Sequence, residues 1–198
     1  EGNVSPKMSA LVAEAGLTAF AGQMGKSIDI ISEGTCLIIS GPSGVDAVMQ
    51  AATDLCETLA VTVLVSNAEH VPMDRRFDCV LGSVKNATGA LGGFTLKIDG
   101  LQEVIVGGRG AFKLTPRQDG AASQCDIIVD LSGQNPMFPA HEKRDGYLRA
   151  DPTHAPSIAK AIFAASQLIG TFEKPLYVRL EESLCAHKRA EQPACSNC

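Results

Sequence analysis

The chain has 198 residues, of which 45% are hydrophobic and 20% charged, a balance typical of a globular protein with a real core. The formal net charge is −5, and no stripe of Lys and Arg interleaved with aromatic residues occurs, so we do not expect nucleic-acid binding. The apolar runs are shorter than the roughly 18–20 residues of a membrane span, and no signal peptide opens the sequence, so we expect a cytoplasmic protein.

The first part of the chain predicts a helix, a strand and then a β-α-β unit. Residues 6–17 (PKMSALVAEAGL) place apolar side chains at helical spacing, and residues 27–32 (SIDIIS) alternate like a strand. Residues 35–40 (TCLIIS) predict a strand, and residues 45–59 predict a helix after a tight GPSG turn. Residues 59–65 (LAVTVLV) predict a second strand, apolar on both faces, which belongs inside a parallel sheet covered by helices.

The middle of the chain predicts antiparallel strands, and the pattern then returns to a buried strand and a helix. Residues 79–100 are rich in Gly and alternate in GGFTLKIDG, which predicts a β-hairpin, and LQEVIVGG with GAFKLT adds further strand. Residues 125–133 (CDIIVDLSG) predict a third parallel strand. SIAKAIFAASQLIG predicts a helix with Pro156 near its start and Gly170 at its end, and KPLYVRLEESL predicts a short strand and turn.

These elements predict an α/β fold with a Rossmann-like parallel sheet and an antiparallel β insertion at about residues 77–115. We expect an N-terminal helix and linker over residues 1–34 and the α/β domain over residues 35–170. Residues 171–198 then begin a cysteine-rich module.

The turn after the first strand of the β-α-β unit, ISGPSG, tests the sequence for a dinucleotide site. A pyrophosphate needs glycines for a tight turn and for close approach of the backbone at a helix N-terminus. Gly41 and Gly44 fit two positions of the G-x-G-x-x-G frame, but Ile39 stands at the first, and Ser66 follows the second strand where a ribose-binding acid is expected. Two interpretations of Gly41 and Gly44 therefore stay open, a degenerate FAD or NAD site and a turn that serves folding alone. We favour the folding role.

The third predicted parallel strand also contains two carboxylates. Asp126 and Asp130 are four residues apart on a strand, hence on the same face, and Asp130 is near the strand's carboxyl end. We favour a loop-capping role for them over a catalytic one.

Seven cysteines divide into two groups. Those in apolar runs are expected to be small buried hydrophobes, and they are Cys36, Cys56, Cys79 and Cys125. The second group stands among charged and polar residues near the end of the sequence.

This second group comprises Cys185, Cys195 and Cys198, the last two at C-x₂-C spacing. Such spacing fits zinc, a redox dithiol or an iron–sulfur cluster. No other C-x₂-C or paired His completes a zinc site, and a thioredoxin-type dithiol begins a helix in the body of its fold. An iron–sulfur cluster takes four cysteine ligands, so the three cysteines in these residues do not complete its ligand set.

Residues 169–198 (IGTFEKPLYVRLEESLCAHKRAEQPACSNC) resemble bacterial ferredoxin-type proteins that carry 4Fe–4S clusters. The resemblance extends upstream through residues 125–152 and 82–100 to residues 6–17. The hairpin segment 82–100 (GSVKNATGALGGFTLKIDG) is also similar to a segment of the large flavoprotein subunit of heterodisulfide reductase.

The resemblance implies electron transfer through 4Fe–4S clusters, with Cys185, Cys195 and Cys198 as iron ligands and a redox partner protein or oxidoreductase subunit as partner. It also implies that the chain is a central fragment of a longer protein and comprises an α/β body and part of a ferredoxin module. We expect the cluster to be absent from this fragment. Two alternatives stay open. One is a flavin- or NAD(P)-dependent oxidoreductase domain, and the other is a structural docking module whose crevice is filled by Ile39 and Met137.

Overall fold

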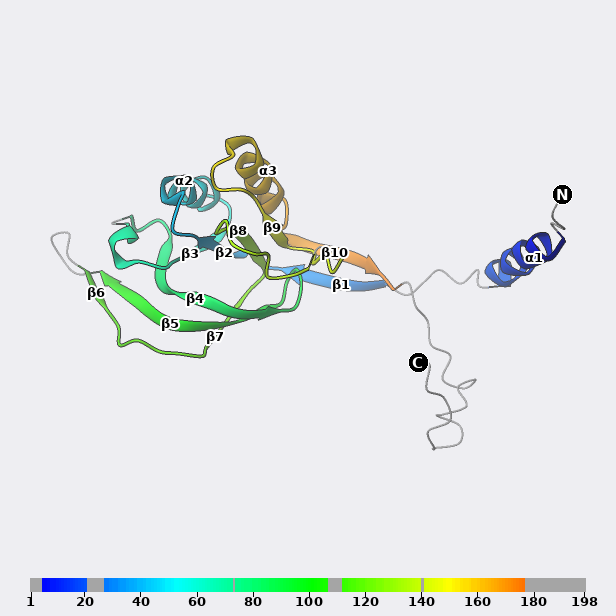
Figure 1. Ribbon diagram of the computed structural model, residues 1–198, viewed down its shortest axis with the longest axis horizontal. Coiled ribbons are helices and arrows are strands. Elements are labelled where there is room, and N and C mark those ends of the chain that lie inside the picture. Colours follow the sequence, from blue (N-terminus) through cyan, green and yellow to red (C-terminus); the bar gives the residue numbers. More distant parts are fainter. Residues whose placement is uncertain (1–4, 21–26, 73, 107–111, 140, 177–198) are drawn as a thin grey trace, which may run out of the picture. The chain divides into compact units, whose positions relative to one another are not determined.

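A computed structural model (Figure 1) describes residues 5–20, 27–72, 74–106, 112–139 and 141–176, without the side chains of residues 17–20 and 106. The chain divides into two units, a body formed by Ile30–Phe172 and a smaller unit formed by Glu1–Asp29 and Glu173–Cys198. Among the described helices, none combines the length and the apolar character needed to cross a membrane.

The smaller unit contains helix α1 (Ser5–Phe20), which confirms the predicted N-terminal helix and exposes the apolar side chains of Met8 and Leu11. Strand β1 (Ser27–Ser32) was also predicted, and it pairs with β10 (Gly170–Pro175) in a two-stranded sheet.

The body confirms the predicted α/β class, with a mixed eight-stranded sheet in the order β6-β5-β4-β3-β2-β8-β9 and with β7 paired to β5. The strands with parallel pairings are β2 (Thr35–Ser40), β3 (Ala60–Val65), β4 (Asp78–Thr88), β8 (Ile127–Leu131) and β9 (Tyr147–Arg149). The antiparallel partners are β5 (Phe94–Val106), β6 (Phe112–Leu114) and β7 (Ala121–Cys125).

Helices α2 (Val45–Leu55) and α3 (Ala155–Ser166) cover one face of the parallel strands (Figure 1). Between these helices and the sheet lies the first core, which includes Ile38 and Val63 of the strands and Val48 and Ala165 of the helices. All four side chains are fully buried, which accounts for the continuous apolar runs in the sequence.

The end of α3 differs from the prediction. Pro156 lies in the first turn as expected, and His154 caps the helix by accepting a hydrogen bond from the Ser157 amide. The helix, however, ends at Ser166, and Gly170 begins β10 instead of ending the helix. Leu168 lies beyond the helix and packs against the first core.

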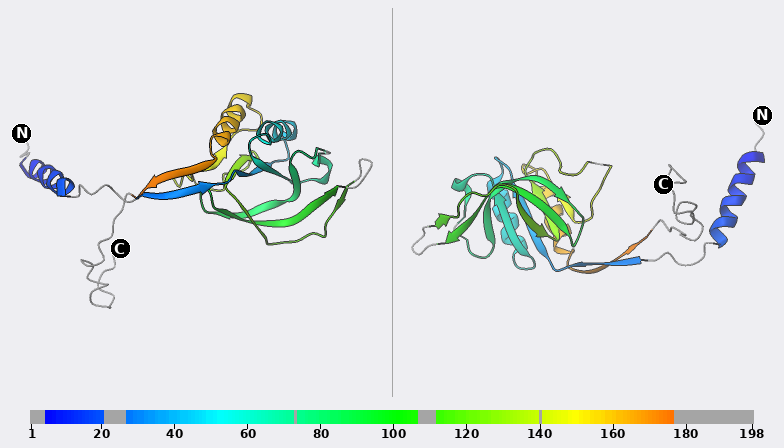
Figure 2. Two further views of the ribbon diagram at one scale, coloured as in Figure 1. Left: turned by 180° about the vertical axis from the view of Figure 1, so that it is seen from behind. Right: turned by 90° about the horizontal axis from the view of Figure 1, so that it is seen from below.

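The other face of the parallel strands is covered by antiparallel strands rather than by helices. Strand β4 pairs with β3 at its start, shifts register near Gly82 and continues as an antiparallel partner of β5. Strand β7 pairs with β5 and leads directly into β8. In the view from below in Figure 2, these antiparallel strands lie in front and the helices behind.

The strands enclose a second core on this face. It consists of Leu37, Ile39, Leu64, Ala87, Phe94, Leu96, Ile98, Cys125, Ile128 and Phe138. Phe94 is completely buried, and the rings of Phe138 and Tyr147 meet edge to face with centroids 5.0 Å apart. The sheet therefore buries both of its faces although helices cover only one.

The third parallel strand predicted over residues 125–133 is confirmed as β8, which pairs with β2, but its start differs from the prediction because Cys125 ends β7 and Asp126 lies between the two strands. The Asp126 amide donates to the carbonyl and the hydroxyl oxygens of Thr35. Its carboxylate accepts hydrogen bonds from the amides of Glu33 and Thr35. These bonds interrupt the strand and confirm the capping role expected for Asp126.

We expect the second core to contribute strongly to stability. Phe94→Ala removes a side chain that is 0% exposed, so the free energy of unfolding should fall by about 3–5 kcal/mol. The matched Phe163→Ala on α3, where the ring is 70% exposed, should change it by less than about 0.5 kcal/mol. Urea denaturation measures both variants, and Phe94→Leu provides a milder change if Phe94→Ala does not fold. Equal losses at the two positions would contradict a packed second core.

Candidate functional site

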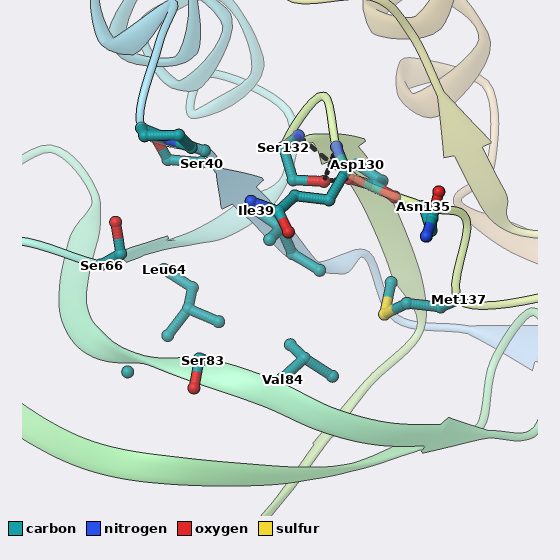
Figure 3. Close-up of a pocket in the computed structure, with 14 residues that line it drawn as sticks. Ile39, Ser40, Leu64, Ser66, Ser83, Val84, Asp130, Ser132, Asn135 and Met137 are labelled. Atoms are coloured by element: carbon teal, nitrogen blue, oxygen red, sulfur yellow. Dashed lines mark hydrogen bonds between the residues drawn. The ribbon is translucent and has the colours of Figure 1, made fainter.

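The strand order reverses at β2, which makes this strand the switch point of the sheet. Strands β3 and β4 continue on one side of β2, whereas β8 and β9 continue on the other. In open α/β sheets, ligands bind in the crevice outside the carboxyl ends of the strands at such a point. A cavity of about 290 Å³ lies here, bounded by the ends of β2, β3 and β8 and by β4 (Figure 3).

Asp130, at the carboxyl end of β8, is the buried charge of this site and is 2% exposed. Its Oδ1 accepts hydrogen bonds from the Ser132 amide at 3.0 Å and from the Ser132 hydroxyl at 2.6 Å. Its Oδ2 accepts one from the Tyr147 hydroxyl at 2.5 Å, and the Arg149 Nε lies 3.8 Å away. The carboxylate is buried with its partners, as a charge in a protein interior requires.

The same partners fix the loop after β8. The Gln134 amide donates to the Ser132 hydroxyl, and the Met137 amide donates to the Tyr147 hydroxyl, each at 3.2 Å. The Arg149 guanidinium donates to the Gln134 carbonyl. Asp130 thus caps the loop through Ser132, Tyr147 and Arg149, which confirms the capping role expected from the sequence.

Tyr147 serves this network as a hydrogen-bond donor. Burial raises the pKa of its hydroxyl well above the ordinary value, and the hydrogen bond to Asp130 and the charge of that carboxylate raise it further. The phenol therefore keeps its proton at neutral pH, holds Asp130 and cannot act as a base there.

The two glycines of the ISGPSG turn are held against other loops of the body. A Cβ on Gly41 would lie 2.0 Å from the Ser132 carbonyl oxygen, and one on Gly44 would lie 2.7 Å from Cβ of Pro152. Gly44 also has a φ of +78°, a left-handed conformation that favours glycine. Loop packing by itself accounts for glycine at both positions, and their contact with a dinucleotide stays a prediction.

The other residues considered for the crevice lie on its walls. Ile39 and Met137 line the cavity together with Leu64 and Val84, and the space between these side chains remains open. Ser66 lines the cavity at the end of β3. The structure thus brings Gly41, Ile39, Ser66 and Met137 to one site, whereas Gly44 is not part of its lining.

The described cysteines are buried or half-buried, as predicted. Burial raises the pKa of Cys36 and of Cys125 to about 12 and that of the half-buried Cys79 to about 11. Cys56 is half-buried and donates a hydrogen bond to the Thr53 carbonyl. Within the described part of the chain, no group of three or more His, Cys, Asp or Glu side chains is arranged to hold a metal ion.

The proposed iron ligands Cys185, Cys195 and Cys198 lie outside the described residues.

Sequence reasoning missed Tyr147 and Arg149. Both belong to β9, which has only three residues and follows a proline-rich loop, so no periodicity marks it. The one pattern that could have indicated them is the alternation in Tyr-Leu-Arg, because a strand places its first and third side chains on the same face.

No protein-family model matches the chain, and neither a curated protein nor a solved structure matches it. The function therefore has to be inferred from the residues and their geometry.

We expect Asp130→Asn to loosen the loop after β8, because an amide in place of the carboxylate loses the charged acceptor for Ser132 and Tyr147. The free energy of unfolding should fall by about 2–3 kcal/mol. Hydrogen exchange of the Met137 amide should become faster. The control is Asp78→Asn at the exposed start of β4, which should change stability by less than about 0.5 kcal/mol. Unchanged stability and unchanged Met137 exchange in Asp130→Asn would contradict the capping role.

Gly41→Ala tests the packing of the ISGPSG turn against the β8 loop. Because backbone rather than a flexible side chain blocks the new Cβ, we expect a loss of about 1–3 kcal/mol in urea denaturation. Gly93→Ala is the matched control, since a Cβ there meets nothing within 4 Å. The control should remain as stable as the native chain, and an equally stable Gly41→Ala would refute the close approach.

Proposed function

We propose that the protein transfers electrons through a 4Fe–4S cluster to which Cys185, Cys195 and Cys198 contribute thiolate ligands. In this proposal the α/β domain is a Rossmann-like body that docks a redox partner protein or a subunit of an oxidoreductase. The three thiolates would hold the cluster, which would supply one-electron transfer between a reduced and an oxidised partner.

The observation behind this proposal is the division of the cysteines into two chemical groups. Iron is bound by thiolates, and thiols become ligands where their pKa is low or the metal can reach them. Burial raises the pKa of Cys36, Cys79 and Cys125, so these thiols stay protonated at neutral pH. These three thiols are poor candidates for iron ligation, and the proposal places it, as the resemblance to ferredoxin-type proteins implies, on the cysteines that stand among charged and polar residues.

The spacing of those cysteines supports the assignment. Cys195 and Cys198 match the first two positions of the C-x₂-C-x₂-C-x₃-C-P run of bacterial ferredoxins. Cys185 and the preceding KPLYV segment belong to the stretch that resembles ferredoxin-type proteins. Three thiolates leave one iron of a cubane cluster to be bound by a further ligand.

A flavin- or NAD(P)-dependent domain is the second candidate, and the position of the cavity at the switch point favours it. Two observations weigh against it. The Ser132 carbonyl covers one side of Gly41, and none of the described residues lining the cavity is Lys or Arg, which would neutralise a pyrophosphate. The residues that line the cavity therefore agree better with an α/β body that docks a partner and holds no dinucleotide.

Anaerobic reconstitution with ferrous iron, sulfide and excess 2-mercaptoethanol tests the cluster, because the small thiol can supply the missing ligand. We expect bound iron, acid-labile sulfide and, after reduction with dithionite, an EPR signal of a reduced cluster. The double variant Cys195→Ser/Cys198→Ser should lose all three signals, because the hard oxygen of serine is a much poorer ligand for an iron–sulfur cluster than a soft thiolate.

The matched control is Cys56→Ser, which removes a thiol of the body and should load as the native chain does. A native chain that takes up neither iron nor sulfide would contradict the proposal. So would equal loading of the native chain and the double variant.

A further inference from the structure

We propose that the cavity at the carboxyl ends of β2, β3 and β8 binds an uncharged small molecule with an apolar body and hydrogen-bonding groups at its rim. The inference is independent of the iron–sulfur cluster, because it depends only on residues of the body. Its basis is the combination of apolar walls, uncharged polar groups and a fixed loop in one cavity.

The walls of the cavity are apolar on opposing sides. Ile39 of β2 and Leu64 of β3 come from the parallel sheet, whereas Val84 of β4 and Met137 of the β8 loop approach from other elements (Figure 3). A volume of about 290 Å³ lies just below the roughly 300–1,000 Å³ of sites for drug-sized ligands, which suits a smaller ligand with a single ring. A flexible thioether such as that of Met137 adapts its shape to such a ring.

The rim provides uncharged hydrogen-bonding groups. Ser66 and Ser83 line the cavity with hydroxyls, and Asn135 lines it with an amide. In Figure 3, Ser66 and Asn135 lie on opposite sides of the apolar pair Leu64 and Ile39. None of these three side chains hydrogen-bonds to another described residue, so their donors and acceptors are available to a ligand.

The charges around the cavity select against ionic ligands. None of the described lining residues is Lys, Arg or His, so an anion would find no counter-charge there. The one charged lining residue, Asp130, is already bound by Ser132 and Tyr147 and lies next to Arg149. A cation would therefore lose its hydration without gaining a free carboxylate.

The cavity is also preformed. The hydrogen bonds from Met137 to Tyr147 and from Gln134 to Ser132 hold the loop that forms one wall. A ligand that enters such a site does not have to order the loop, so less of the interaction energy is lost on binding.

Three small molecules of nearly the same shape test whether the cavity prefers uncharged ligands. At pH 7 benzamide is neutral, benzoate is an anion and benzamidinium is a cation. Methyl NMR signals of Ile39, Leu64, Val84 and Met137 report on the cavity. We expect benzamide to shift these signals saturably with a Kd of about 1 mM, because it is a small ligand of few atoms. Benzoate and benzamidinium should bind at least about tenfold more weakly, a difference of about 1.4 kcal/mol.

The variant Ser83→Phe should place a ring at the cavity and abolish the benzamide shifts. Thr88→Phe is the matched control, because Thr88 is exposed on the same strand and does not line the cavity. Ser66→Phe replaces Ser83→Phe if the latter does not fold. The proposal is overturned if benzamide causes no saturable shifts, if either ion binds as tightly as benzamide, or if the shifts persist in the blocked and folded variant.

Discussion

The buried carboxylate of Asp130 is the constraint on which the carboxyl edge of the sheet depends. A charge that is 2% exposed needs partners, and the chain supplies them from the β8 loop and from β9. The hydrogen bonds around this carboxylate hold residues 132–137 against Tyr147 of β9, and the Asp130 carboxylate helps to keep the Tyr147 hydroxyl protonated. The cavity exists because the loop that forms its wall is held in this way, and the Ser132 carbonyl of the same loop requires glycine at position 41.

The body covers the two faces of its sheet by different means. Helices α2 and α3 bury one face, and the antiparallel strands that β4 begins bury the other. A second layer of strands leaves the carboxyl edge open between β4 and the β8 loop, where the cavity lies. The same layer explains why Phe94, Leu96 and Ile98 alternate with exposed residues in β5, since only one face of that strand is buried.

Periodicity alone predicted the elements of this fold that are long and strongly patterned. The β-α-β unit, the hairpin strands and α3 were all visible in the sequence, because burial on one or two faces leaves a regular pattern. The division of residues 125–133 at Asp126 was not, since it depends on hydrogen bonds to Thr35, which is distant in the sequence. For the site, position along β8 predicted that Asp130 would lie at the crevice. Its partners Tyr147 and Arg149 could not be predicted, because β9 is too short to show a period.

Burial raises the pKa of three thiols of the body, those of Cys36, Cys79 and Cys125. The proposed redox chemistry is assigned to Cys185, Cys195 and Cys198. Cysteine-selective alkylation of the native chain, read by mass spectrometry before and after loading with iron and sulfide, tests this division most directly. Labelling of these three cysteines should fall on loading, whereas labelling of Cys56 should not change. Unchanged labelling of all three on loading, or protection that appears instead at the cysteines of the body, would contradict it.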